Sequence, residues 1–339
     1  MQMKNNNKNS RLSIRQIADL AGVSPTTVSF VLNGRAEKYN ISPATCERVR
    51  AVVKQYNYRQ NFHGRAIKEG KTFLVGVIIH NFTSSFWNQI IAGICRELTA
   101  NGYHMLLDEA GSDHAREEQA FAYMSQIGVD GIISALNFSF TDSENLQLPP
   151  YWYEQKVVNI LHPLPNIPSV YTDHFCGMSK VMNEFLRCGH RRIAFLGGLC
   201  GNINYRLNEN YRAFNTICAA NNIEAFHFDT AEALLQNRHK FTAVLCRRDS
   251  EAKILYDACR DMNISIPQEL SIAGYGGVEW IVNSSRPRLT TVYEPKEDLG
   301  VVAVRRILAL IDQQSDPDEP LYTQLEPQLV CGGSIRILQ

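Results

Sequence analysis

Small hydroxyl side chains that can bond phosphate oxygens and base edges cluster near the start of the chain. They lie within residues 13–33, which read SIRQIADLAGVSPTTVSFVLN. One short segment of this stretch has apolar residues on one face and an uncharged face on the other. The uncharged face consists of Thr26, Thr27, Ser29 and Phe30. These residue types predict a surface that reads DNA, with a helical hairpin in an ordinary small core as the alternative.

Two short helices must position this surface. Apolar spacing predicts a first helix over Ile14–Ala21, and Gly22 suits its left-handed C-terminus. Ser24 offers an N-cap hydroxyl to the second helix, and Pro25 fits its first turn. A third helix is predicted after the N-cap Ser42. This order is typical of a helix-turn-helix head, whose second helix enters the major groove of DNA.

Charge is divided unevenly along the chain, which has 339 residues and a net charge of zero. Residues 1–71 hold 13 Lys or Arg and four acids, a net charge of +9. The remaining residues hold 21 Lys or Arg and 30 acids, a net charge of −9. Because the basic part coincides with the predicted helix-turn-helix, binding to a polyanion such as DNA is favoured over simple solvation.

The head is expected to lie between two segments of different character. Residues 1–11 are polar and rich in Asn and Lys, which predicts disorder. The DNA-binding domain is predicted over residues 12–60, and a linker over 61–71. The linker is either a plain connection or a short helix over Phe62–Lys68 that orders on DNA. In the second case it projects Ile67 as an apolar wedge into the minor groove.

From residue 72 to the end, buried strands alternate with amphipathic helices. One run extends from FLVGVII (73–79) to VVNIL (157–161), and a second is predicted to restart at SVYTD (169–173). Repeated units of this kind predict two α/β lobes, each a doubly wound parallel sheet. Ligands bind at the carboxyl ends of such strands, so a small-molecule site is expected between the lobes.

Motifs that would indicate other classes of protein are missing from the sequence. No run of about 18 apolar residues predicts a membrane span, and no apolar h-region predicts a secretory signal. The nine cysteines form no C-x-x-C pair, which favours free thiols in a reducing cytosol over a zinc site. No phosphate loop or nucleophile elbow is present. We therefore predict a cytoplasmic, nucleoid-associated protein without cofactor or enzymatic activity.

The sequence resembles the lac-repressor family of bacterial transcription regulators over nearly all of residues 12–335. Stretches that carry the resemblance include SIRQIADLAGVSPTTVSFVLNG, GVIIHNFTSSFW, CGHRRIAFLGG and RPRLTTVYEPKEDLG. It implies a repressor that binds a pseudo-palindromic operator in double-stranded DNA as a homodimer or tetramer, under the control of a small molecule. A periplasmic-type solute-binding protein is the alternative, and the basic head argues against it.

The resemblance also implies how the two lobes share the chain. The chain would cross between them near residues 162–165, 292–295 and 321–326. The first lobe would comprise residues 72–163 and 294–323, and the second lobe residues 164–293 and 324–339.

The resemblance assigns contacts with DNA position by position. Pro25 and Thr26 fall on the pair that reads bases. Phe30 stands where many members have an Arg, which suits guanine. An aromatic ring cannot form that bidentate bond, so contact with a thymine methyl group is one expectation. Ile67 stands at the position of the usual Leu wedge. The other predicted DNA contacts are Ser13, Ile14, Ser24, Thr27, Ser29, Asn33, Tyr39, Ser42, Thr45, Tyr58, Asn61, Gly64 and Arg65.

Some predicted effector-binding residues match the family. Phe86 and Trp87 match an aromatic pair that lines the family's cleft. Asp173 matches a family acid that follows a crossing. Arg206 is one place out of register with the family's Arg, and the Gly expected three residues after it is missing.

Other effector positions depart from the family. The usual Asn-Asp reads Arg248-Asp249 and is preceded by Arg247, and the usual Gly-Tyr-Asp ends in Gly276. The site thus gains cations and loses an acid that would bind sugar hydroxyl groups. Three interpretations stay open: an anionic or phosphorylated ligand, an unusual sugar, or loss of small-molecule control. For the arginines alone, exposure to solvent or pairing with Asp249 is the simpler explanation.

Overall fold

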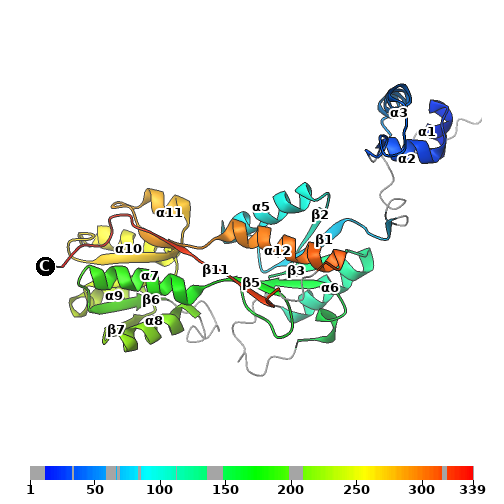
Figure 1. Cartoon of the computed structure of the whole chain (residues 1–339). Helices are drawn as coiled ribbons and strands as arrows, with labels where there is room; N and C mark the ends of the chain where they lie inside the picture. The colour runs from blue at the N-terminus through cyan, green and yellow to red at the C-terminus, as the bar shows by residue number, and fades with distance from the viewer. Residues whose placement is uncertain are drawn as a thin grey trace, which may run out of the picture. The chain divides into compact units, whose positions relative to one another are not determined.

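The computed structural model describes residues 12–32, 34–58, 66, 69–82, 85–111, 113–135, 148–197, 209–314 and 319–338. Contacts divide the chain into two compact units, Met1–Thr72 and Phe73–Gln339 (Figure 1). Several predictions lie outside the described residues, namely the disordered terminus 1–11, most of the hinge, and the site residues Asn33, Asn61, Gly64, Arg65, Ile67 and Arg206.

The first unit contains three helices around a small apolar core. They are α1 (Ile14–Ala21), α2 (Pro25–Leu32) and α3 (Pro43–Gln55). The first helix ends where predicted, because Gly22 adopts the left-handed conformation with φ of 63°. The core residues are Ile17, Ala18, Ala21, Val28, Val31, Cys46 and Val49. The predicted helix-turn-helix is thus confirmed.

The second unit contains two six-stranded sheets, and the first is parallel throughout its described strands. In sheet order these are β11 (Tyr322–Leu325), β5 (Ser169–Thr172), β4 (Val157–Ile160), β3 (Gly131–Ser134), β1 (Leu74–Ile79) and β2 (His104–Glu109). Alternate residues of β1 pack on opposite faces of this sheet. Val77 belongs to the core cluster that also contains residues of α5 (Ser85–Ala100) and α12 (Lys296–Asp312). Ile78 belongs to the cluster with residues of α6 (His114–Ile127).

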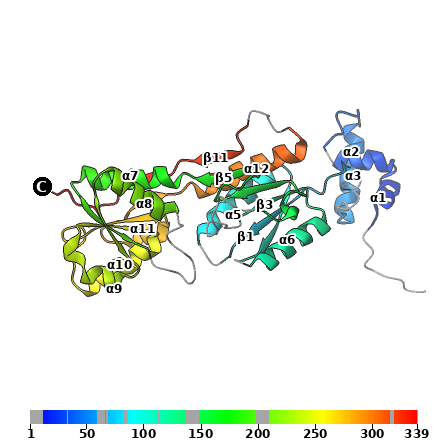
Figure 2. The same cartoon turned by 90° about the horizontal axis from the view of Figure 1, so that it is seen from below.

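The second sheet has the same plan. In sheet order its strands are β12 (Gln328–Val330), β10 (Thr290–Tyr293), β9 (Ser271–Gly276), β8 (Ala243–Cys246), β6 (Arg192–Leu196) and β7 (Glu224–Phe228). Only β12 is antiparallel to its neighbour among these described strands. Helices cover both faces (Figure 2). They are α7 (His174–Arg187) and α8 (Glu209–Ala220) on one face, and α9 (Ala231–Gln236), α10 (Asp249–Asp261) and α11 (Glu279–Ser284) on the other. Two doubly wound lobes are thus confirmed.

The pairing of β5 corrects the predicted boundary between the lobes. β5 pairs with β4 and β11, so the chain leaves the first sheet after Thr172 and not at 163/164. The predicted boundary at 323/324 falls inside β11, which ends at Leu325. The crossing expected near 292–295 agrees with the end of β10. Residue types can identify a strand, but the sheet it joins depends on segments far away in the sequence.

Several elements were not predicted from residue patterns. These are α9, α11, α12 and the strands β10, β11 and β12. Helix α12 packs on α5 and contributes to the core of the first lobe, although most of that lobe precedes it in sequence by more than a hundred residues. Among the described helices, none is long and apolar enough to cross a membrane.

Candidate functional site

Three serines that were predicted to contact DNA cap the helices of the head. Ser24 Oγ accepts the backbone N–H of Thr27 at 3.0 Å, and Ser42 Oγ accepts that of Thr45 at 3.3 Å. Ser13 caps α1 in the same way, through a reciprocal capping box. Capping fixes where each helix begins. The start of a helix carries positive partial charge and unpaired N–H groups, which favour phosphate.

The exposed face of α2 is narrower than predicted. Pro25 and Thr26 are exposed, as base-reading residues must be. Ser29 is only 8% exposed and is buried together with Val28 and Val31. The prediction that Ser29 belongs to the free face of α2 is therefore wrong, because its position on the helix turns it toward the packed side.

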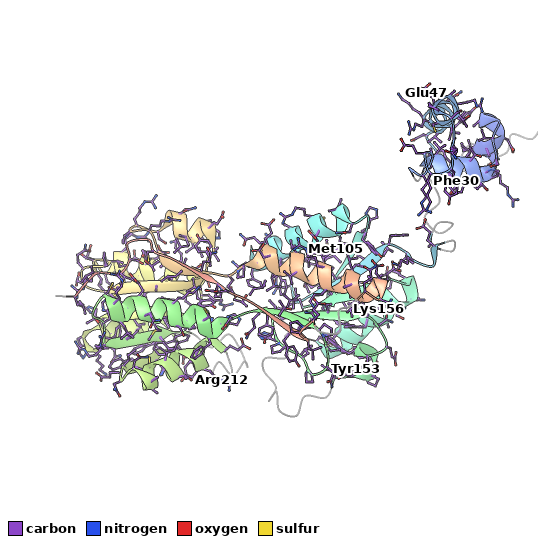
Figure 3. All side chains as sticks on the ribbon, viewed as in Figure 1. Phe30, Glu47, Met105, Tyr153, Lys156 and Arg212 are labelled. Atoms are coloured by element: carbon purple, nitrogen blue, oxygen red, sulfur yellow. The ribbon has the colours of Figure 1, made fainter. Side chains whose placement is uncertain are left out.

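The other predicted contacts in the head differ in exposure. Ile14 and Tyr58 are half-buried and pack against the apolar core of the head, and burial raises the pKa of the Tyr58 phenol. Phe30 is half-buried, and its ring stacks on Tyr39 with centroids 3.7 Å apart. Tyr39 is 46% exposed. In Figure 3, Phe30 on α2 lies well away from the acidic Glu47 on α3.

The described surface of the head has more basic than acidic side chains. The basic residues are Arg15, Arg35, Lys38, Arg48, Arg50 and Lys54, and the acids are Asp19, Glu37 and Glu47; all are exposed. An excess of positive charge on a helix-turn-helix attracts the phosphate backbone without regard to sequence. Of the predicted hinge helix, the structure describes Ala66, whose carbonyl accepts the Gly70 N–H at 2.8 Å.

In the second unit, the two predicted arginines share one carboxylate. Glu251 Oε1 accepts from Arg247 Nη2 at 2.9 Å and from Arg248 Nη2 at 3.2 Å. Burial raises the pKa of Glu251, but the two guanidinium groups together hold it below its ordinary value. The partner is thus Glu251, and the suggested pairing with Asp249 is wrong. The Arg247 side chain is buried against this carboxylate, whereas that of Arg248 is also 56% exposed to solvent.

Asp249 is fully buried and bonded to protein groups. Its carboxylate accepts from Thr291 Oγ1 and from the Val278 N–H, each at 2.6 Å. Burial raises its pKa. A Cβ at Gly276 would lie 3.8 Å from Asp249 and 3.8 Å from Glu294 Oε2. Asp249 therefore holds β10 and the loop after β9 in place, and a second carboxylate lies beside the position where the family's acid is missing.

Glu294 was not among the predicted site residues. Its side chain is 10% exposed, and burial raises its pKa despite the nearby cations. Its nearest charged partner is His174, whose Nδ1 lies 4.0 Å from Glu294 Oε1. Among the described residues the carboxylate receives no hydrogen bond within normal range. It stands in the segment that returns the chain to the first lobe, and an acid in such a segment was the signal available in the sequence.

A polar cluster surrounds Glu294 at the lobe crossings. His174 Nδ1 lies 3.1 Å from the buried Tyr275 hydroxyl, and His174 Nε2 lies 3.7 Å from Glu209. Glu209 also lies 3.4 Å from His162 Nδ1, which follows β4 of the first lobe. Burial raises the pKa of Glu209, but the two histidines lower it below its usual value. These side chains join segments of both lobes.

Of the predicted effector residues, Gly276 and Phe86 lie beside Lys296, whereas Trp87 packs in the core and Asp173 caps a helix. Lys296 donates to the Gly276 carbonyl and lies 5.6 Å from the centroid of the Phe86 ring. Burial lowers the pKa of Lys296. Trp87 is 5% exposed and belongs to the core of the first lobe. Asp173 caps α7 by accepting the N–H of Cys176 at 2.8 Å.

Three family models match this chain. "Bacterial regulatory proteins, lacI family" matches residues 13–61, and "Periplasmic binding proteins and sugar binding domain of LacI family" matches residues 72–204. A periplasmic binding protein-like domain matches residues 182–335. The chain belongs to the lacI family of bacterial regulatory proteins. It is a DNA-binding transcription regulator with a periplasmic-binding-protein-like effector domain, and a regulator of this family is not an enzyme, as predicted.

Curated operon repressors match this chain over almost their full length. The ribose operon repressor of Escherichia coli (strain K12) is 26% identical, over 95% of this chain and 99% of that protein. The sucrose operon repressor of Streptococcus mutans is 27% identical, over 95% and 99%. The lac repressor dimer bound to operator and the anti-inducer ONPF has the same fold, with a TM-score of 0.80 and 21% identity over 96% of this chain and 100% of that one.

Proposed function

We propose that this lacI-family protein is a repressor that binds a pseudo-palindromic operator as a homodimer, and that a small molecule controls its affinity for DNA. The observation that carries the proposal is the basic helix-turn-helix head, with serine-capped helix starts and exposed Pro25 and Thr26, ahead of a two-lobed core. The ribose and sucrose operon repressors support repression as the outcome. Operator binding would place the protein at the nucleoid, in the cytoplasm.

Each head reads one half-site through α2, and the paired hinges open the minor groove at the centre. Ile67 is the proposed wedge in the hinge, because an apolar side chain inserted between base pairs unstacks and bends DNA. Ile67→Gly should reduce the bending of operator DNA, and Ile67→Leu should preserve it. Unchanged bending by Ile67→Gly would rule out the wedge.

The core would also set the spacing of the two heads. Ligand that favours one arrangement of the lobes would change the separation of the hinges in the dimer. DNA and ligand then influence each other through one equilibrium, without contact between them. The polar cluster that links His162, Glu209 and Glu294 is suited to this role, because it joins groups from both lobes.

The charges near the crossings favour a neutral effector rich in hydroxyl groups over an anionic one. Arg247 and Arg248 both pair with the Glu251 carboxylate. Lys296 lies near the carboxylates of Glu294, Asp249 and Glu279. The buried Glu294 carboxylate is placed to accept hydrogen bonds from ligand hydroxyl groups, beside the position where the family's acid is missing. Of the three interpretations left open by the sequence, an unusual sugar or polyol is the one we propose.

Selection from a random DNA pool by the full-length protein tests the DNA-binding proposal. The expected result is a pseudo-palindrome whose binding constant falls steeply as salt rises, because counterions are released from the phosphates. Thr26→Ala should change the selected sequence, whereas Glu224→Gln, an exposed control on β7, should not. Failure to enrich any sequence would overturn the proposal.

A thermal-shift screen of neutral sugars, polyols and sugar phosphates tests the effector. A neutral ligand should raise the melting temperature of the wild type, and Glu294→Gln should weaken that ligand more than Arg248→Gln. Stabilisation by sugar phosphates alone, lost in Arg248→Gln, would contradict the neutral-ligand proposal. If no member of the screen shifts the melting temperature or alters operator binding, a protein without small-molecule control is the better description.

A further inference from the structure

The loop after α2 holds a tyrosine against the helix proposed to read DNA. Between Gly34 and Ile41 the chain is closed by a hydrogen bond from the Ile41 N–H to the Ala36 carbonyl, at 2.9 Å. Ala36 and Ile41 both pack against the apolar core of the head. Tyr39 lies between these two anchors. Its position is thus determined by the loop and not by its own exposed side chain.

Tyr39 and Phe30 form a nearly parallel ring pair. The ring centroids are 3.7 Å apart and the planes differ by 8°. Nearby, the Arg35 N–H donates to the Phe30 carbonyl at 2.9 Å, which ties the start of the loop to the same turn of α2. Stacking covers one face of the Phe30 ring and removes much of its rotational freedom. The loop thus holds the Phe30 ring in one orientation.

This arrangement limits what Phe30 can do at a base pair. A phenyl ring has no donor for guanine, and a ring with one face already covered cannot be sandwiched between two bases. Its remaining surface is apolar, and the apolar group that a base pair presents in the major groove is the 5-methyl of thymine. A ring held in advance also loses less conformational entropy on binding than a free one.

We propose that Tyr39 is a positioning residue that holds Phe30 for contact with a thymine methyl group at one base pair of each half-site. The inference rests on the proposed operator binding and adds the specificity of one position. Loss of one buried methyl contact corresponds to about a fourfold loss of affinity for each half-site.

The test begins with operators selected by the full-length protein and by Phe30→Arg. The base pair whose preference changes between the two pools is the one that Phe30 contacts, and the wild type should prefer thymine there. Replacing that thymine by deoxyuridine, which lacks only the methyl group, should weaken wild-type binding about fourfold per half-site. Equal affinity for thymine and deoxyuridine, or a preference for another base, would overturn the proposal.

Variants at Tyr39 test the positioning role separately. Tyr39→Phe keeps the stacked ring and should keep the ratio of thymine to deoxyuridine affinity. Tyr39→Ala and Tyr39→Leu remove the flat ring and should bring the ratio close to one. Tyr39→Leu retains apolar bulk, so it reports on stacking even if Tyr39→Ala unfolds the head. If folded Tyr39→Leu has the same ratio of thymine to deoxyuridine affinity as the wild type, Tyr39 does not position Phe30. A failure to select any operator would instead overturn the proposed function.

Discussion

At the scale of single residues, the structure changes the meaning of the charged side chains near the crossings. Arg247 and Arg248 suggest an anion site in the sequence, but both guanidinium groups pair with the Glu251 carboxylate. Glu251 lies four residues after Arg247 and three after Arg248, a spacing at which helix side chains meet. This pairing could therefore have been predicted from the sequence. Glu294 was different, because only the fold places it beside Gly276.

Glu251→Gln should lower the free energy of unfolding by about 3 kcal/mol, because Arg247 would stay buried without its carboxylate. Urea denaturation measures the change. Asp257→Asn is the matched control on the same helix, since its partner Lys253 is more exposed and such pairs contribute less than about 1 kcal/mol. A loss no larger than that of the control would show that the buried ion pair adds no net stability.

The buried His190 side chain should make the stability of the protein depend on pH. Its ring nitrogens lie 2.8 Å from Thr242 Oγ1 and 3.1 Å from the Arg336 carbonyl, and burial lowers its pKa from 6.5 to about 4. Because the unfolded chain takes up this proton first, stability should fall by about 3 kcal/mol as the pH drops through the range between those pKa values.

Urea denaturation across that pH range measures the effect of His190. His190→Gln should be less stable at neutral pH, and its stability should fall less steeply than that of the wild type as the pH drops from 6.5 to about 4. Asp249 and Glu294, whose pKa values are raised, and Glu251, whose pKa is lowered, are present in both proteins, so their titration cancels when the two slopes are compared. An unchanged slope in His190→Gln would contradict the prediction.

At the scale of elements, close contact between α5 and α12 joins the first lobe to a late part of the chain. The two helices pack together in the core and lie side by side in both views (Figures 1 and 2). A Cβ at Gly93 would overlap the Glu297 carbonyl oxygen, and one at Gly300 would overlap that of Ile90. Glycine is thus required on both helices for this approach.

Gly300→Ala should reduce the free energy of unfolding by about 2 kcal/mol or more, because the added methyl group meets backbone atoms that cannot rotate away. Thermal and urea unfolding measure the loss. Cys95→Ala, at an exposed position of α5, is the control and should change stability little. If Gly300→Ala is as stable as this control, α5 and α12 can move apart at little cost.

At the scale of the whole molecule, the second lobe exposes large apolar side chains on two neighbouring helices. Ile254 on α10 is 58% exposed and Trp280 on α11 is 61% exposed, and these helices pack on each other. Large apolar side chains exposed on adjoining helices are candidates for a site of association. The proposed dimer gives them a partner, namely the same surface of a second copy.

Trp280→Glu should therefore weaken the dimer, because a charge would be buried against an apolar surface. Sedimentation velocity should show dissociation at concentrations where the wild type is dimeric, together with weaker operator binding. Tyr123→Glu changes an aromatic residue on α6 of the first lobe that is 51% exposed, and it should leave the dimer intact. A dimer in Trp280→Glu as stable as the wild type would place the interface elsewhere.

The sequence by itself determined those features that depend on residues close together in the chain. Helix α1, its glycine C-cap and the serine N-caps follow from spacing and side-chain chemistry within a few residues. The two parallel-sheet lobes follow from repeated strand–helix units. The family resemblance extended these local patterns to DNA binding.

Only the tertiary structure decided which distant segments meet. It assigned β5 to the first sheet, since pairing depends on hydrogen bonds between strands and not on the residue types of one strand. It brought Glu294 next to Gly276, and it placed Tyr39 on Phe30 across a loop. Strand pairing decides the register, and the other two contacts carry our proposals for ligand chemistry and base preference. Each depends on where two groups distant in the sequence lie relative to one another.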